Sequence, residues 1–239
     1  MNGRSRVLWL SVPTAVIAIY FAIGFWMAYY FPVSGFNEVF QLVNSATGPF
    51  SGVIASNFLY DGFSNVIVFG IFTGIFLVTG LLLPIKVLRG RTVFLLLGMF
   101  TVPLIPEVLS RIYLRATVIT GPAGTITITN IAYGQSGVLS AAMGIIFIFT
   151  LLTITRGQWI QRLSFLGGLT YSTILGVLMG IEVLLFSGLF TTDWATEIVH
   201  LGSLIGGAAL TVVYYLLTER SSPAREKTAY LIPASKVKA

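Results

Sequence analysis

The sequence contains no cysteine and a single histidine, His200. Disulfide bonds, thiolate nucleophiles and cysteine metal sites are therefore excluded, and so is a metal site built from several histidines. Charged residues are scarce as well, at 9% of the 239 residues, against about 25% in an average soluble domain. So few charges cannot cover the surface of a water-soluble globule, which excludes a soluble enzyme, a nucleic-acid-binding module and a disordered chain.

What the sequence does contain is long apolar runs, with 56% hydrophobic residues and a mean hydropathy of +0.91. A helix needs about 20 mainly apolar residues to cross the roughly 30 Å hydrocarbon core of a bilayer. Six runs approach or exceed that length: Val7 to Phe31, Phe63 to Leu83, Thr92 to Leu109, Ser136 to Thr153, Leu163 to Leu185 and Thr196 to Leu217. The third contains Pro103 and Pro106 near its end, so we expect a kink or a break there. The first has no small-residue cleavage site, which favours an uncleaved helix over a signal peptide.

The positions of the basic residues predict the orientation of these helices. Twelve of the 14 Lys and Arg residues flank the spans on one side of the membrane, and only Arg111 and Arg115 lie on the other. The positive-inside rule then places both termini in the cytoplasm. We therefore predict an all-α membrane protein, a bundle of six transmembrane helices over residues 1–217, followed by a mobile basic cytoplasmic tail over 218–239.

Two longer connections lie on the predicted outer side. Pro32 to Gly62 carries scattered apolar residues and is expected to lie in the membrane interface. Ser110 to Gln135 contains alternating threonine and isoleucine over Thr125 to Thr129, and two glycines nearby at 121 and 124. This pattern predicts an extended segment with a turn.

Four polar residues stand out because polar groups inside a membrane span are costly and usually mark function: Asn65, Ser136, Glu182 and His200. Asn65, Ser136 and His200 each lie 20 or 21 residues from the basic residue that bounds their helix on the cytoplasmic side. At 1.5 Å per residue this is roughly 30 Å, so the three are expected at one level near the outer face. Glu182 falls at a similar level, where its carboxylate would pair with an outer arginine such as Arg111 or Arg115 or reach interfacial water.

A serine, a histidine and an asparagine at one level form a set with a known chemistry. A neutral imidazole is the usual base that activates a serine hydroxyl as a nucleophile. An asparagine amide donates to the oxyanion that forms when the serine attacks a carbonyl group. The set therefore predicts acyl transfer by a serine–histidine pair.

The sequences around these residues resemble the rhomboid family of intramembrane serine proteases. The fourth helix opens with Gly134-Gln135-Ser136-Gly137, which is the pattern G-x-S-G, and the sixth contains Val199-His200-Leu201-Gly202-Ser203. The resemblance implies a six-helix rhomboid-like bundle in which Ser136 is the nucleophile and His200 the general base. Asn65 and the backbone N–H of Ser136 would hold the oxyanion. The resemblance also offers a second interpretation of Glu182, at the gate between the second and fifth helices where rhomboid substrates enter. It further implies transmembrane protein substrates, no metal or other cofactor, no nucleic acid, and a multi-pass location in the lipid bilayer of a prokaryotic cell membrane.

The sequence departs from the family pattern at three positions. Asp61 stands where rhomboids commonly have a histidine, Ser140 replaces an aromatic residue that often stacks on the catalytic histidine, and Ser203 replaces a glycine. These changes leave a non-catalytic rhomboid-like protein that binds membrane clients as one alternative. A small-solute channel is another, and it predicts polar residues throughout the depth of the bilayer. Small residues at 202, 203, 206 and 207 are expected to pack the sixth helix against the fourth.

Overall fold

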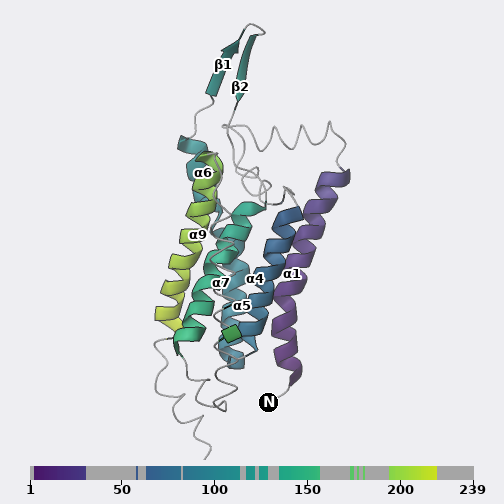
Figure 1. Ribbon diagram of the computed structural model, residues 1–239, viewed down its shortest axis with the longest axis vertical. Helices are drawn as coiled ribbons and strands as arrows, with labels where there is room; N and C mark the ends of the chain where they lie inside the picture. Colours follow the sequence, from purple (N-terminus) through teal and green to yellow (C-terminus); the bar gives the residue numbers. More distant parts are fainter. Residues whose placement is uncertain are drawn as a thin grey trace, which may run out of the picture.

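The computed structural model describes residues 3–30, 58, 63–81, 83–113, 117–121, 124–128, 135–156, 173–174, 177, 180 and 194–219. In chain order its elements are α1 (Gly3–Tyr30), α4 (Phe63–Gly80), α5 (Ile85–Thr101), α6 (Leu104–Tyr113), β1 (Thr117–Gly121), β2 (Gly124–Ile128), α7 (Ser136–Arg156), α9 (Trp194–Tyr214) and the π-helix η2 (Tyr215–Glu219). The helices stand side by side with the β1–β2 hairpin beyond one end (Figure 1). We call that end the upper end and the opposite end, where α1 begins, the lower end.

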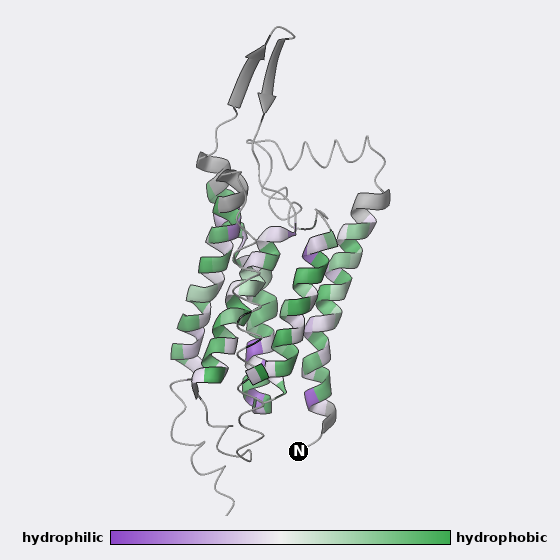
Figure 2. Ribbon diagram, viewed as in Figure 1, coloured by the Kyte–Doolittle hydropathy of each residue, from purple (hydrophilic) through white to green (hydrophobic). Residues whose placement is uncertain are grey.

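Five helical segments of the bundle are long and apolar enough to cross a membrane: Ser5–Trp26, Phe63–Gly80, Ile85–Leu109, Ser136–Thr155 and Ile198–Glu219. They confirm five of the six predicted spans, and a chain with five such helices fits a multi-pass membrane protein. The remaining prediction, Leu163 to Leu185, lies outside the described residues except for four positions. The helices are mostly apolar along their length (Figure 2), and many of their large apolar residues are exposed, as a lipid-facing surface requires.

The third span is interrupted where the sequence predicts it. Helix α5 ends at Thr101 and α6 begins at Leu104, so the break falls at Pro103, which lacks a backbone N–H. The expected extended segment with a turn is confirmed as an antiparallel hairpin that pairs Thr117 with Ile128 and Gly121 with Gly124.

Two predicted boundaries are wrong at the lower end of the bundle. Lys86, Arg89 and Arg91 were expected in a loop, but α5 begins at Ile85, directly after Pro84, and contains all three. Pro84 is the N-cap residue, and its backbone is still extended, with φ −57° and ψ 142°, so the helix begins at the next residue. Helical structure also continues to Glu219, two residues past the predicted end of the bundle at residue 217. Hydropathy alone makes both helices too short at their lower ends, because it assigns every charged residue to a loop.

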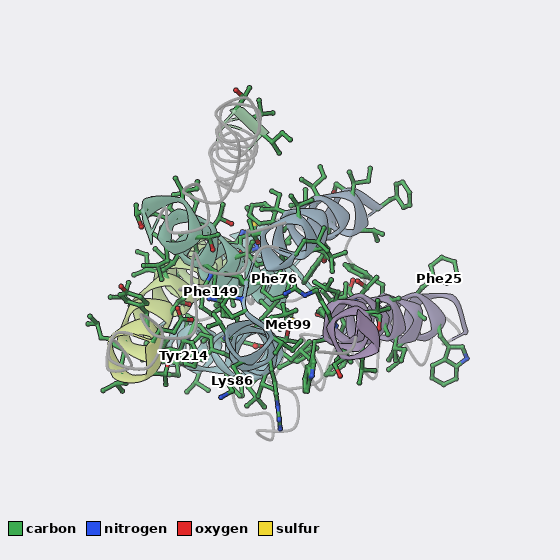
Figure 3. The ribbon with its side chains drawn as sticks, turned by 90° about the horizontal axis from the view of Figure 1, so that it is seen from below. Phe25, Phe76, Lys86, Met99, Phe149 and Tyr214 are labelled. Carbon is green, nitrogen blue, oxygen red and sulfur yellow. The ribbon has the colours of Figure 1, made fainter. Side chains whose placement is uncertain are left out.

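The core surrounds α7, which packs against α4, α5 and α9, whereas α1 lies outside α4 and α5. Seen from the lower end, Phe76, Met99 and Phe149 point into the interior, whereas Phe25 on α1 points away from it (Figure 3). Phe76, Met99 and Phe149 are at most 1% exposed. Because α7 is enclosed by three helices, its first residue has a defined position relative to its neighbours.

Candidate functional site

The three predicted site residues lie near the upper ends of three different helices. Ser136 is the first residue of α7 and is partly buried. His200 lies in the second turn of α9 and is 8% exposed, with a buried Nε2 atom. Asn65 is the third residue of α4 and is partly buried. These helices all begin at the upper end (Figure 1), and both α4 and α9 pack against α7.

Helices α7 and α9 meet backbone to backbone. A Cβ atom added to Gly207 of α9 would lie 2.5 Å from the carbonyl oxygen of Ala141, and one added to Gly144 of α7 would strike the carbonyl oxygen of Leu204. Small residues at both positions are what allow this approach, as in other membrane helix pairs. The prediction that α9 packs on α7 through small residues is therefore confirmed for Gly207.

Gly202 and Gly206 contact a different neighbour from the one expected. A Cβ at Gly202 would lie 2.8 Å from Cβ of Pro106, and one at Gly206 would lie 3.0 Å from Cγ1 of Val102. These two glycines thus face the break between α5 and α6. Gly202 and Gly206 lie on one face of α9 and Gly207 on another, because residues one position apart in a helix point about 100° away from each other.

The close contact shows which residues of α7 and α9 lie at the same level. Both helices run downward from the upper end (Figure 1), and Gly144 lies at the level of Gly207 because each touches the residues around the other. One turn higher, Ser140 is level with Ser203, and both are fully buried. Two turns higher, Ser136 is level with residues 199 and 200. The register thus gives Ser136 and His200 a common height along the interface between their two helices.

The interface just below this level is polar. The Ser140 hydroxyl donates a hydrogen bond of 2.8 Å to the carbonyl oxygen of Ser136, one turn earlier in the same helix. The Oγ atom of Ser203 is buried and has no hydrogen-bond partner among the residues that the structure describes. A buried hydroxyl of this kind is uncommon in a packed interior.

Gln135, next to the candidate nucleophile, is a site residue that sequence reasoning missed. Its side chain is fully buried, and its Nε2 donates to the carbonyl oxygen of Tyr20 on α1 at 3.5 Å. Gly24 leaves room for this amide, because a Cβ there would strike Nε2 and would lie 2.8 Å from the carbonyl oxygen of Phe58. Gln135 therefore attaches the start of α7 to α1. The available signal was a glutamine in an otherwise small and apolar stretch.

The same contact sets the depth at which α7 begins. Helix α1 continues for six residues beyond Gly24, to Tyr30. At 1.5 Å per residue, α7 begins about 9 Å below the upper end of α1. Ser136, the next residue, therefore lies below the upper end of a neighbouring helix.

The remaining candidates of the sequence are not described. Asp61 and Glu182 lie outside the described residues. Within the described part of the chain, no three His, Asp or Glu side chains gather where a metal ion could bind. No protein-family model, no curated protein and no solved structure matches the chain. The resemblance to rhomboid proteases therefore depends on the residues around Ser136, His200 and Asn65.

Proposed function

We propose that the chain is an intramembrane serine endopeptidase of the rhomboid type, with a Ser136–His200 dyad. One observation carries the proposal. Helices α7 and α9 touch at Gly144 and Gly207, and the same register followed upward gives Ser136 and His200 a common level. Nucleophile and base on two tightly packed helices would keep a fixed geometry, which catalysis requires.

In the proposed reaction, the Ser136 hydroxyl attacks the carbonyl carbon of a peptide bond while His200 accepts its proton. His200 then gives this proton to the leaving amine, and a water molecule hydrolyses the resulting ester and regenerates the serine. Asn65 and the backbone N–H of Ser136 would donate to the oxyanion.

The start of α7 suits an oxyanion. Ser136 is the first residue of the helix, and the first four N–H groups of an α-helix have no partner within it. The positive end of the helix dipole also favours negative charge at this position. The N–H of Ser136 is therefore one of the groups without an acceptor inside the helix, and it lies where the proposal needs a donor for the oxyanion.

The substrates in this proposal are transmembrane segments of other proteins. A helix hides its carbonyl groups in internal hydrogen bonds, so we expect cleavage near glycine, proline or other residues that unwind a helix. The proposal retains six spans with both termini in the cytoplasm, because 12 of the 14 basic residues fall on one side of the predicted spans. It also retains a prokaryotic cell membrane as the location, which the resemblance implies. The site then opens on the outer side.

A non-catalytic rhomboid-like protein that binds membrane clients is the alternative. Asp61 favours it, since a carboxylate repels an oxyanion, and so does Ser140, which supplies no ring to stack on His200. The retained pair of Ser136 and His200 favours the protease, because a client-binding protein needs neither a nucleophile nor a base.

Cleavage of a model transmembrane substrate by the purified protein tests the proposal. We expect the wild type to cut it, and Ser136→Ala and His200→Ala to lose the activity. Ser11→Ala is the matched control, because Ser11 is exposed on α1 and its hydroxyl donates to the carbonyl oxygen of Leu8 in the same helix. Cleavage that survives Ser136→Ala would refute the proposal, and a wild type without activity on any substrate would favour the client-binding alternative.

A further inference from the structure

Arg91 is a fully charged side chain that is almost completely buried, at 1% exposure, at the lower end of α5. Its Nε and Nη2 atoms donate to the two carboxylate oxygens of Glu219 in η2, each at 2.8 Å. Its Nη1 atom donates to Thr153 Oγ1 at 2.8 Å and to the carbonyl oxygen of Phe149 at 3.1 Å, both on α7. One guanidinium therefore connects α5, α7 and the end of α9.

The geometry of this contact is specific. The pair is bidentate, with two parallel N–H···O bonds, and this arrangement fixes orientation as well as distance. The guanidinium also lies over the Phe149 ring, with 4.7 Å from Cζ to the ring centroid. Thr153 and Phe149 are one turn apart on α7, so the contact spans a full turn of that helix. Arg91 and Glu219 form an ion pair that is almost completely buried, with side chains that are 2% and 5% exposed.

The position of Glu219 depends on the last turn of α9. From Tyr215 to Glu219 the helix is a π-helix, whose bonds run from each residue to the fifth one along rather than the fourth. This wider turn changes the direction in which Glu219 leaves the axis, compared with a continued α-helix. A π-helical segment is uncommon and is often found at a functional site.

We infer that Arg91 and Glu219 are positioning residues that fix the axial register of α9 against α7. The glycine contact at Gly207 holds the two helices close together, but small residues also permit sliding. The ion pair adds a directional contact at the lower end, about 28 Å along α9 from His200. If the proposed function holds, the pair thereby sets the height of His200 relative to Ser136, where a 1 Å misplacement costs about 100-fold in rate.

The register can be measured without any activity because the chain contains no cysteine. Ser140 and Ser203 are buried, small and level with each other, so Ser140→Cys with Ser203→Cys introduces one pair across the α7–α9 interface. A disulfide requires Cβ atoms about 3.5–4.5 Å apart, whereas a slip of one turn moves them by about 5.4 Å. The rate of disulfide formation under a mild oxidant therefore reports the register.

We expect Glu219→Gln to slow this crosslinking by about tenfold or more, and Arg89→Gln to leave it unchanged. Arg89 is the matched control: it lies in the same helix, is exposed, and contacts Trp9 rather than α7. In the wild-type background, without the two introduced cysteines, Glu219→Gln should lower kcat and leave KM unchanged, since the substrate still binds.

The double variant Arg91→Met with Glu219→Met separates positioning from stability. A buried ion pair replaced by apolar residues often keeps or gains stability. We therefore expect the double variant to regain the thermal stability that Glu219→Gln loses, while its crosslinking stays slow. Crosslinking at the wild-type rate in the double variant would overturn the inference. This readout stands even if the wild type cleaves nothing, so a failure of the proposed function remains distinguishable from a failure of the inference.

Discussion

The glycine contact between α7 and α9 makes a quantitative prediction for Gly207→Ala. The added methyl carbon would lie 2.5 Å from the carbonyl oxygen of Ala141 and 3.3 Å from Cγ1 of Ile145. Nonbonded heavy atoms prefer separations of about 3.5 Å or more, so the two helices must move apart by about 1 Å. The side chain of Ile145 can rotate away, but the backbone of Ala141 cannot.

Overpacking of this kind costs about 1–3 kcal/mol, and we expect Gly207→Ala to lose that much in the free energy of unfolding. Because the same movement separates Ser136 from His200, cleavage should fall by about 100-fold. Unfolding in detergent micelles and cleavage of a model substrate measure the two effects. Gly74→Ala on α4 is the matched control, since a Cβ there meets nothing within 4 Å. Equal unfolding free energies for the two variants would refute the close contact.

Three further predictions concern residues near the start of α7. Asn65→Ala should lower kcat by about 100- to 1000-fold with little change in KM if Asn65 donates to the oxyanion, and steady-state kinetics on a model substrate measure this. Gly24→Ala should displace the Gln135 amide from α1 and reduce the cleavage rate, and Gln135→Leu should lower the thermal stability. A cleavage rate of Gly24→Ala equal to that of the wild type would contradict this anchoring role. Ser140→Ala should change the free energy of unfolding by less than about 1 kcal/mol, because its hydrogen bond stays within one helix, and a larger loss would indicate that its hydroxyl has a partner on α9.

Hydropathy and composition were sufficient to predict much of the fold. Five described spans, the break at Pro103 and the hairpin after α6 all follow from local rules that act within a few residues. Apolar length decides whether a helix can cross a membrane, proline removes a backbone donor, and alternating threonine and isoleucine favour strands.

The two features that could not be predicted both depend on residues far apart in the sequence. Arg91 and Glu219 are separated by 128 residues, and a scale that treats each charge separately assigns both to water. Paired with each other, they can be buried. Gln135 is likewise buried only because Gly24, more than one hundred residues earlier, leaves space for its amide. No local pattern contains either pairing.

The candidate site could be predicted only in part from the sequence. The types and spacing of Ser136, His200 and Asn65 were sufficient to nominate them, because polar residues are rare in these spans. Their common level was inferred by counting from basic residues, and one of these, Lys86, lies inside α5 because that helix starts earlier than expected. The contact at Gly144 and Gly207 supplies an independent register for two of the three.

Labelling with a fluorophosphonate probe reports whether His200 activates Ser136, because such probes react with a serine only when a base activates it. The purified protein is treated with the probe, and the modified residue is identified by mass spectrometry. We predict a single adduct on Ser136 that is lost in His200→Ala and retained in Ser11→Ala. An unlabelled wild type, or an adduct on Ser136 that persists without His200, would contradict this prediction.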